Sequence, residues 1–226
     1  MRVLGLDTST KYAGVAVVEE GKLLAQASLQ FMASHSEKLI PEIAHTLEIM
    51  KIPLESIDIY AVTIGPGSFT GLRVAISTVK GLSFVTGKKI APLSTLEVMA
   101  RGLPLTDFCI CPMLDARKNE VYAALFKWKD GVLIRLREDS VLKPERLAEW
   151  ISEKTVFIGD GASLYRDKLI NTFSDKAFFT HSIYNVPSPA IVALMGEEKA
   201  KRGELLSART LAPLYLRKSE AEIKFG

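Results

Sequence analysis

The feature that most constrains the fold of this chain is a pattern of strands and turns that occurs twice. Three segments of the first half match segments of the second half in the same order: 6–7 with 114–115, 14–18 with 122–126, and 64–67 with 158–161. In both copies an Asp follows the first apolar run and a glycine turn follows a later one. Matches in one order predict an internal duplication, because a repeat copies a whole supersecondary unit.

The first copy predicts a β-β-β-α-β-α unit. Its expected elements are strands over 3–6, 14–18, 23–29 and 57–64 and helices over 34–50 and 70–86, then a short strand near Ile90 and a helix over 94–101. The first helix begins at a Ser-x-x-Glu capping box, Ser34 to Glu37. The second ends at Gly87, a typical C-terminal stop.

The second copy repeats this plan with a shorter first helix, Pro144 to Glu153, and a last helix over 189–202. We therefore expect an α/β protein with the duplicated actin-like ATPase fold, of the ASKHA and RNase H-like class. Its lobes are expected at 1–103 and 104–226, with helix 189–202 a candidate to pack back across them. The turns after the first strand of each copy would face a common cleft, since ligands of α/β sheets bind where strands end.

Composition excludes several classes of protein. The 226 residues are 48% apolar and 24% charged, which suits a folded globular chain. The formal net charge is +3 and is spread evenly, so neither half is expected to bind nucleic acid on its own. No stretch reaches the ~20 apolar residues of a membrane span, and Asp7 interrupts the N-terminal apolar run too early for a signal peptide. We expect a cytoplasmic protein.

The two cysteines, Cys109 and Cys111, are expected to be buried free thiols. On one face of a strand they would lie about 7 Å apart, which is too far for an unstrained disulfide. Two thiols without a neighbouring histidine are also too few for a zinc site.

Two turns carry groups that suit a phosphate. Asp7-Thr8-Ser9-Thr10 offers amides and hydroxyls, with a carboxylate placed to steer a magnesium-bound water, although the same residues also favour ordinary turns. The segment Gly65 to Arg73 offers a glycine turn and a helix N-terminus, which attracts anions. A close strand-to-helix connection is the alternative interpretation, and no Walker lysine is present. The candidate vestigial phosphate-binding residues are Asp7, Thr8, Ser9, Thr10, Gly65, Gly67, Ser68 and Asp115.

The helix expected over 70–86 is apolar on nearly every side, which is typical of a helix with no free face. It is either the central helix of its lobe or part of a subunit interface. Together with the apolar stripe of helix 34–50 it predicts a partner-binding face, which would also pair two copies when the partner is absent. The candidate interface residues are Leu39, Ile43, Leu47, Met50, Leu72, Ala75, Ile76, Val79 and Gly81.

The three histidines, His35, His45 and His181, form no catalytic triad and no HExxH metal motif. Each is expected to be structural, and no residue is assigned a catalytic role.

Five strings along the chain together resemble the TsaB family, also called YeaZ. They are GLDTST, HSEKLIP, GPGSFTGLRVA, LDARKNEVYAA and PLYLR, and they span nearly the whole sequence. The resemblance implies a bacterial subunit of the machinery that makes N6-threonylcarbamoyladenosine beside the anticodon of tRNA. It implies a non-catalytic protein that binds the catalytic paralogue TsaD through helices of its first lobe, with the ATPase TsaE, and that meets tRNA through the complex.

The sequence departs from TsaD at the positions where that paralogue holds its metal and a phosphate. TsaD carries His-x-x-x-His in the helix after the short strand; Thr95 and Met99 stand there, and neither suits a ferrous or zinc ion. Its Gly-Gly-His-Thr turn is replaced by Asp115-Ala116-Arg117-Lys118, which removes a close backbone approach. We therefore expect no metal and no required cofactor, and ATP or ADP binding stays open.

Two rival functions remain. An active ATP-dependent kinase or ATPase of the same fold is favoured by Asp7, Asp115 and the glycine turns and opposed by the missing second glycine turn. A glycopeptidase, a name attached to this superfamily, has no catalytic group here to support it.

Overall fold

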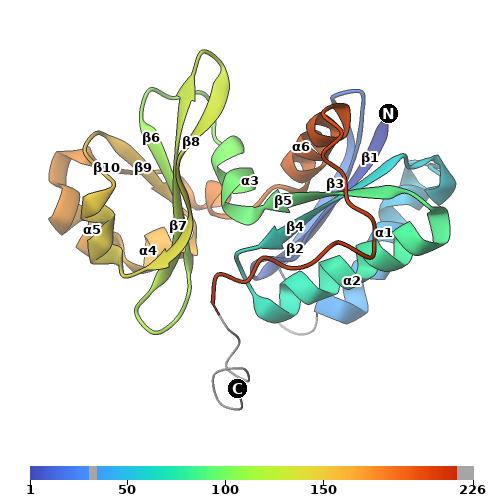
Figure 1. Ribbon diagram of the computed structural model, residues 1–226, viewed down its shortest axis with the longest axis horizontal. Coiled ribbons are helices and arrows are strands. Elements are labelled where there is room, and N and C mark those ends of the chain that lie inside the picture. Colours follow the sequence, from blue (N-terminus) through green and yellow to red (C-terminus); the bar gives the residue numbers. More distant parts are fainter. Residues whose placement is uncertain (31–34, 218–226) are drawn as a thin grey trace. The chain divides into compact units, whose positions relative to one another are not determined.

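The computed structural model describes residues 1–30 and 35–217. They form two compact units, each built on a mixed β-sheet (Figure 1). Unit 1 combines Met1–Val98 with Pro187–Leu214, and unit 2 contains Met99–Val186 with 215–217 in its described part. No helix in the described ranges has the length and apolar character that a membrane crossing requires.

Unit 1 contains the first copy of the repeat. Its elements are β1 (Arg2–Asp7), β2 (Tyr12–Glu19), β3 (Lys22–Gln30), α1 (His35–Ile49), a 3-10 turn η1 (Leu54–Ser56), β4 (Ile59–Gly65), α2 (Phe69–Thr86) and β5 (Lys89–Ser94), and α3 (Thr95–Arg101) follows across the boundary. The sheet order is β3-β2-β1-β4-β5, antiparallel across β1, β2 and β3 and parallel across β1, β4 and β5. Ser34, the first residue of the expected capping box, lies outside the described residues.

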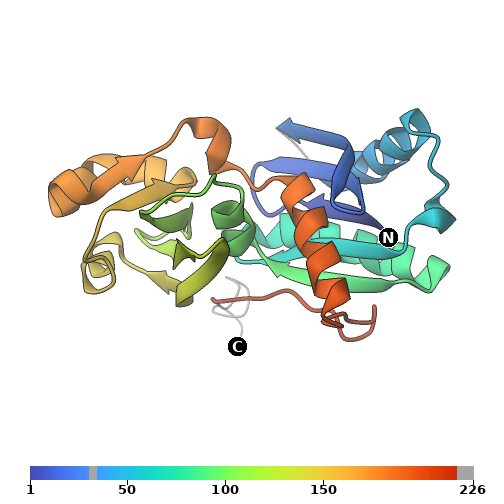
Figure 2. The same cartoon turned by 90° about the horizontal axis from the view of Figure 1, so that it is seen from above.

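Alternating side chains of this sheet build two cores. Leu4 and Leu6 of β1 pack with α1 and α2, whereas Val3 packs on the opposite face with α6 (Pro189–Lys201), which Figure 2 shows lying across the sheet. The contact with α6 is close, because a Cβ added to Gly196 would lie 2.4 Å from the Ala61 Cβ. Unit 1 is therefore a three-layer α/β/α structure.

Unit 2 repeats the topology. Its elements are β6 (Cys109–Asp115), β7 (Val121–Lys129), β8 (Val132–Leu142), η2 (Pro144–Glu149), β9 (Thr155–Ile158), α4 (Asp160–Leu164), α5 (Arg166–Phe173), η3 (Ser174–Lys176), β10 (Ala177–Phe179) and η4 (Ser182–Asn185). The sheet order β8-β7-β6-β9-β10 matches that of unit 1 strand for strand. The predicted duplicated actin-like architecture is confirmed, down to the Asp that ends the first strand of each copy.

Two expectations differ from the structure. The division into 1–103 and 104–226 places 187–214 in the second lobe, whereas this segment packs with unit 1 because α6 covers the second face of that sheet. The helix expected over 144–153 is the short 3-10 element η2, in which Pro144 and Leu147 are buried at a spacing of three residues. That spacing suits three residues per turn.

Candidate functional site

The turn after β1 is closed around the Asp7 carboxylate. Asp7, Thr8 and Ser9 are almost fully buried. The Asp7 Oδ1 accepts hydrogen bonds from the Ser9 hydroxyl (2.6 Å), the Ser9 amide (3.3 Å) and the Thr63 hydroxyl of β4 (2.5 Å). Thr10 Oγ1 accepts from the Tyr12 amide (3.3 Å) of the same turn. The Ser9 hydroxyl and amide, which were predicted as phosphate donors, therefore bind a carboxylate of the chain itself.

Burial dominates the electrostatics of this turn. It raises the pKa of Asp7 from 3.8 to about 6, although the hydrogen bonds from Ser9 and Thr63 work in the opposite direction. A carboxylate that is shielded from water and already accepts three hydrogen bonds is poorly placed to bind a hydrated magnesium ion.

The glycine loop between β4 and α2 packs directly against this turn. The Ser68 amide donates to the Ser9 carbonyl (2.7 Å), and the Thr8 hydroxyl donates to the Gly71 carbonyl (2.6 Å). A Cβ added to Gly67 would lie 2.3 Å from the Ser9 carbonyl oxygen, and a Cβ added to Gly71 would lie 1.9 Å from the Thr8 carbonyl oxygen. These glycines permit contact between two backbones of the same unit, so the alternative interpretation of a close connection fits the loop.

Ser68 and Gly65 have further local roles. The Ser68 Oγ caps α2 by accepting from the Gly71 amide (3.2 Å). Gly65 begins a cis peptide with Pro66, and beside it the Leu214 amide donates to the Ile64 carbonyl (2.7 Å). The C-terminal segment of unit 1 thus borders the glycine loop.

The corresponding turn of unit 2 is also occupied by its own chain. The Asp115 amide donates to the Asp160 carboxylate (3.0 Å), and Asp115 itself accepts from the Arg117 amide (2.8 Å) and lies 3.3 Å from the Arg117 guanidinium. At Gly159 a Cβ would lie 2.1 Å from the Met113 carbonyl oxygen. Three residues of the turn after β6 are exposed and have left-handed backbone conformations, with φ of 61° at Arg117, 53° at Lys118 and 60° at Asn119.

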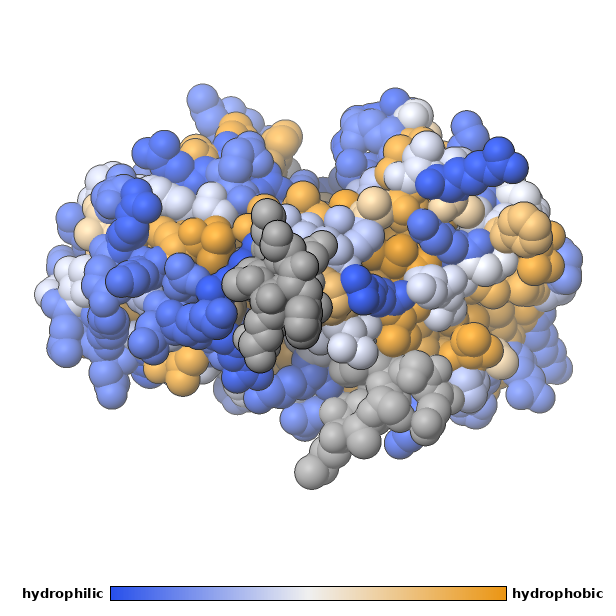
Figure 3. All heavy atoms as spheres, turned by 60° about the horizontal axis from the view of Figure 1, so that its bottom comes forward, coloured by the Kyte–Doolittle hydropathy of each residue, from blue (hydrophilic) through white to orange (hydrophobic). Residues whose placement is uncertain are grey.

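The predicted interface residues are mostly core residues. Seven of them are buried in the cluster between the sheet, α1 and α2: Leu39, Ile43, Leu47, Leu72, Ala75, Ile76 and Val79. Only Met50 and Gly81 are exposed. The apolar surface of these two helices is instead formed by Ile40, Ile49, Phe84 and Val85, and Figure 3 shows apolar side chains gathered over this part of unit 1. The helical periodicity of apolar residues thus identified the side of each helix that faces the core of unit 1.

The positions compared with the TsaD metal motif do not fit a metal. Thr95 and Met99 are both buried, and the Thr95 hydroxyl has no hydrogen-bond partner among the residues that the structure describes. A hydroxyl and a thioether are poor ligands for zinc or ferrous iron. In the described ranges no three His, Cys, Asp or Glu side chains gather into a metal-binding group.

The cysteines are free and buried, as predicted. Burial raises the pKa of Cys109 to about 11 and that of Cys111 still further, so both thiols stay protonated and unreactive at neutral pH. His181 has the expected structural role, because its ring accepts from the Ile183 amide (3.4 Å) at the start of η4.

Sequence reasoning missed the residues that close the two turns. Thr63, Asp160 and Leu214 each lie far along the chain from the residues they bind. One signal was available for Thr63, whose hydroxyl lies between Val62 and Ile64 in the apolar strand that precedes the glycine loop. A buried hydroxyl in such a strand needs a partner.

Comparisons with known proteins agree on one family. The family model described as TsaD, tRNA N6-adenosine threonylcarbamoyltransferase, matches residues 30–225. The tRNA threonylcarbamoyladenosine biosynthesis protein TsaB of Bacillus subtilis is 29% identical over 228 residues, 100% of this chain and 98% of that protein. TsaB of Escherichia coli is 31% identical over 74% of each chain. The solved structure of YeaZ from Pseudomonas aeruginosa has a TM-score of 0.81 at 28% identity, covering 95% of this chain and 99% of the other.

Proposed function

Because the chain belongs to the TsaD family and, within it, to the TsaB (YeaZ) group, we propose that it is a non-catalytic subunit of the bacterial complex that makes N6-threonylcarbamoyladenosine in tRNA. In this role it binds TsaD and, together with TsaD, the ATPase TsaE. It activates threonylcarbamoyl transfer by TsaD and meets tRNA through the complex.

The observation that carries this proposal is that the chain's own backbone fills both turns that were expected to bind phosphate, the turn after β1 and the turn after β6. The Ser9 carbonyl occupies the space beside Gly67, and the Met113 carbonyl occupies the space beside Gly159. A nucleotide phosphate needs free amides that point outward, yet the Ser68 and Asp115 amides already donate within the chain. This closure supports a subunit that contributes a surface rather than a catalytic centre.

The surface proposed for TsaD includes the exposed apolar side chains of α1, of the turn after it and of α2: Ile40, Ile49, Met50, Phe84 and Val85. Phe84 and Val85 are 86% and 80% exposed, which is unusual for large apolar side chains. Exposed apolar surface on a monomer often marks an interaction site. The same helices are proposed to pair two copies when TsaD is absent.

Reconstitution tests the proposal. Purified TsaD, TsaE, tRNA and threonylcarbamoyl-adenylate are combined with and without this chain, and modified adenosine is measured by mass spectrometry of the digested tRNA. We expect modification to rise at least tenfold with the chain present. An equal rate in both samples contradicts the proposed role.

The rival function, an ATP-dependent kinase or ATPase, is tested on the chain alone. Asp7 and Asp115 are both present, which is the observation in its favour. Isothermal titration with ATP and Mg²⁺, followed by phosphate release, is expected to show weak binding and no sustained turnover. Robust turnover that Asp7→Ala abolishes would make the rival the better account.

A further inference from the structure

The two copies of the repeat differ in how one face of the sheet is covered. In unit 1 the connection from β3 to β4 is α1, whose Leu39, Ile43 and Leu47 pack over the sheet together with Leu24 of β3. In unit 2 the same connection, from β8 to β9, is only η2. Fifteen residues of α-helix span roughly 22 Å, whereas six residues of 3-10 helix span about 12 Å. Part of the unit 2 sheet therefore lacks the cover that its counterpart has.

The uncovered area is a row of aliphatic side chains on β8. Val132, Ile134 and Leu136 are 59%, 39% and 43% exposed, and of the β8 residues only Leu142 belongs to the buried cluster of unit 2. Ile134 lies opposite Lys127, whose amine pairs with Glu153. Residues directly opposite each other on neighbouring strands share a face, so this row lies on the face that η2 covers only in part.

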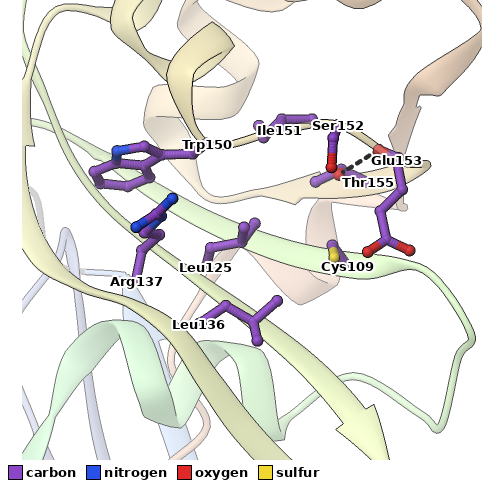
Figure 4. Close-up of a pocket in the computed structure, with 9 residues that line it drawn as sticks. All are labelled: Cys109, Leu125, Leu136, Arg137, Trp150, Ile151, Ser152, Glu153 and Thr155. Atoms are coloured by element: carbon purple, nitrogen blue, oxygen red, sulfur yellow. Dashed lines mark hydrogen bonds between the residues drawn. The ribbon is translucent and has the colours of Figure 1, made fainter.

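The row leads into a pocket of about 290 Å³. Its floor is formed by Cys109, Leu125 and Leu136, and its wall by the segment that joins η2 to β9. Figure 4 shows the Arg137 guanidinium below the Trp150 indole at one end, with Glu153 at the other. The volume is below the usual range for small-molecule ligands, roughly 300–1,000 Å³, and suits one or two protein side chains.

A bulge in β8 directs the side chains of Leu136 and Arg137 into the pocket. Arg135 pairs with Phe126 and Arg137 with Leu125, so Leu136 is an additional residue in the strand. Arg135 is paired with Asp139, whereas Arg137 is exposed and has no hydrogen bond or ion pair with any described residue. The pocket therefore ends in an available cation beside a half-buried aromatic ring.

From this arrangement we infer that the β8 row and its pocket form a docking site for an amphipathic helix of a partner protein. The helix takes the position that α1 takes in unit 1, with aliphatic side chains at i, i+4 and i+8 and an acidic residue that reaches Arg137. Addition of a strand to the β8 edge is disfavoured, because bulges and alternating charges protect such edges. RNA is disfavoured because the charged lining residues, Arg137 and Glu153, balance each other.

A probe for this site already exists in the sequence. The peptide of residues 36–51 covers the matching face of unit 1, with Leu39, Ile43 and Leu47 at the required spacing and Glu42 and Glu48 as acidic groups. The full-length chain carrying Trp128→Phe leaves Trp150 as the only tryptophan. Fluorescence of Trp150 then reports occupation of the pocket.

We expect a saturable change in Trp150 fluorescence with a Kd between about 10 and 100 µM. Leu136→Glu should weaken binding at least tenfold and Arg137→Gln about threefold, whereas Leu29→Glu, which changes an equally exposed leucine of unit 1 (43% exposed in both cases), should leave the Kd within a factor of two. A peptide with Ser at positions 39, 43 and 47 should not bind. The inference is overturned by the absence of a saturable signal up to 1 mM or by equal affinity in the Leu136→Glu chain. It is likewise overturned if the chain alone self-associates through this site, shown by a dimer in ultracentrifugation that Leu136→Glu removes.

Discussion

At the scale of single residues, Gly71 shows how tightly the two unit 1 segments are joined. It lies in the first turn of α2, where Ala normally stabilises a helix relative to Gly by about 1 kcal/mol. A Cβ at this position would lie 1.9 Å from the Thr8 carbonyl oxygen, so the backbones must separate. We predict that Gly71→Ala lowers the free energy of unfolding by ~2 kcal/mol or more, measured by urea titration.

Gly81 of the same helix is the matched control. Apart from its chain neighbours and the backbone of its own helix, no described atom lies within 4 Å of the Cβ that Gly81 would gain, and Gly81 is exposed. Gly81→Ala is therefore expected to raise the free energy of unfolding by roughly 0.5–1 kcal/mol. Similar stabilisation by both substitutions would show that the turn and the loop are not in contact.

The Asp7 carboxyl predicts a pH dependence of stability. Its pKa is raised from 3.8 to about 6 by burial, so between these values the folded chain binds more protons than the unfolded chain. The stability that protonated Asp7 provides is complete below pH 3.8 and is lost as the pH rises through 6. We expect the wild-type free energy of unfolding to fall by about 2 kcal/mol relative to Asp7→Asn between pH 4 and pH 7.

The comparison with Asp7→Asn removes the contribution of all other titrating groups. Urea titrations of both proteins at several pH values give the difference directly. Parallel curves across pH 4 to 7 would mean that the carboxyl is accessible to water and open to a ligand.

Among the helices and strands, α2 contributes to the core with one set of residues and to the surface with another. Leu72, Ala75 and Val79 face the sheet, whereas Phe84 projects into solvent. We predict that Phe84→Glu changes the free energy of unfolding by less than about 0.5 kcal/mol. It should weaken TsaD binding by ~2 kcal/mol or more, because apolar anchors near an interface centre dominate its energy. Surface plasmon resonance with immobilised TsaD measures this.

Ile183 provides the control for this prediction. It is a 73% exposed apolar residue of unit 2, and Ile183→Glu carries the same change of charge and polarity. Its affinity for TsaD should stay within a factor of two of wild type. Equal losses in both variants would point to a general effect of negative charge instead of an α2 interface.

The predicted helix boundaries agree with the structure where the apolar periodicity extends over a long segment. Helix α2 begins within one residue of the expected start and ends at Thr86 as predicted, because Gly87 adopts a left-handed cap. Four of the candidate interface residues on the same helix, Leu72, Ala75, Ile76 and Val79, face the core, since periodicity identifies an apolar side without showing what covers it. Gly81 is exposed, and the interface itself stays a prediction. Helix 144–153 was also wrong, because Leu147 and Pro144 alone anchor a short 3-10 turn.

At the scale of the whole molecule, the duplication was readable from sequence. The Asp turns and glycine turns recur in order, and the two sheets have the same strand order. The unit boundaries were not readable, since α6 returns to unit 1 by contacts such as Gly196 with Ala61, which are distant in the chain. The hydrogen bonds that close the turns after β1 and β6 could not be predicted for the same reason. Thr63 and Asp160 bind residues that are distant in the chain.

Two variants, compared in one reconstituted reaction with TsaD, TsaE, tRNA and threonylcarbamoyl-adenylate, separate a catalytic centre from a docking surface. Asp7→Asn removes the carboxylate that an ATPase of this fold would need, and Phe84→Glu removes an apolar surface anchor without touching either turn. We predict that Asp7→Asn keeps the activation of tRNA modification within a factor of two, whereas Phe84→Glu reduces it at least tenfold. If a folded, TsaD-bound Asp7→Asn chain fails to activate while Phe84→Glu activates normally, the chain acts through its own catalytic centre and the account is wrong.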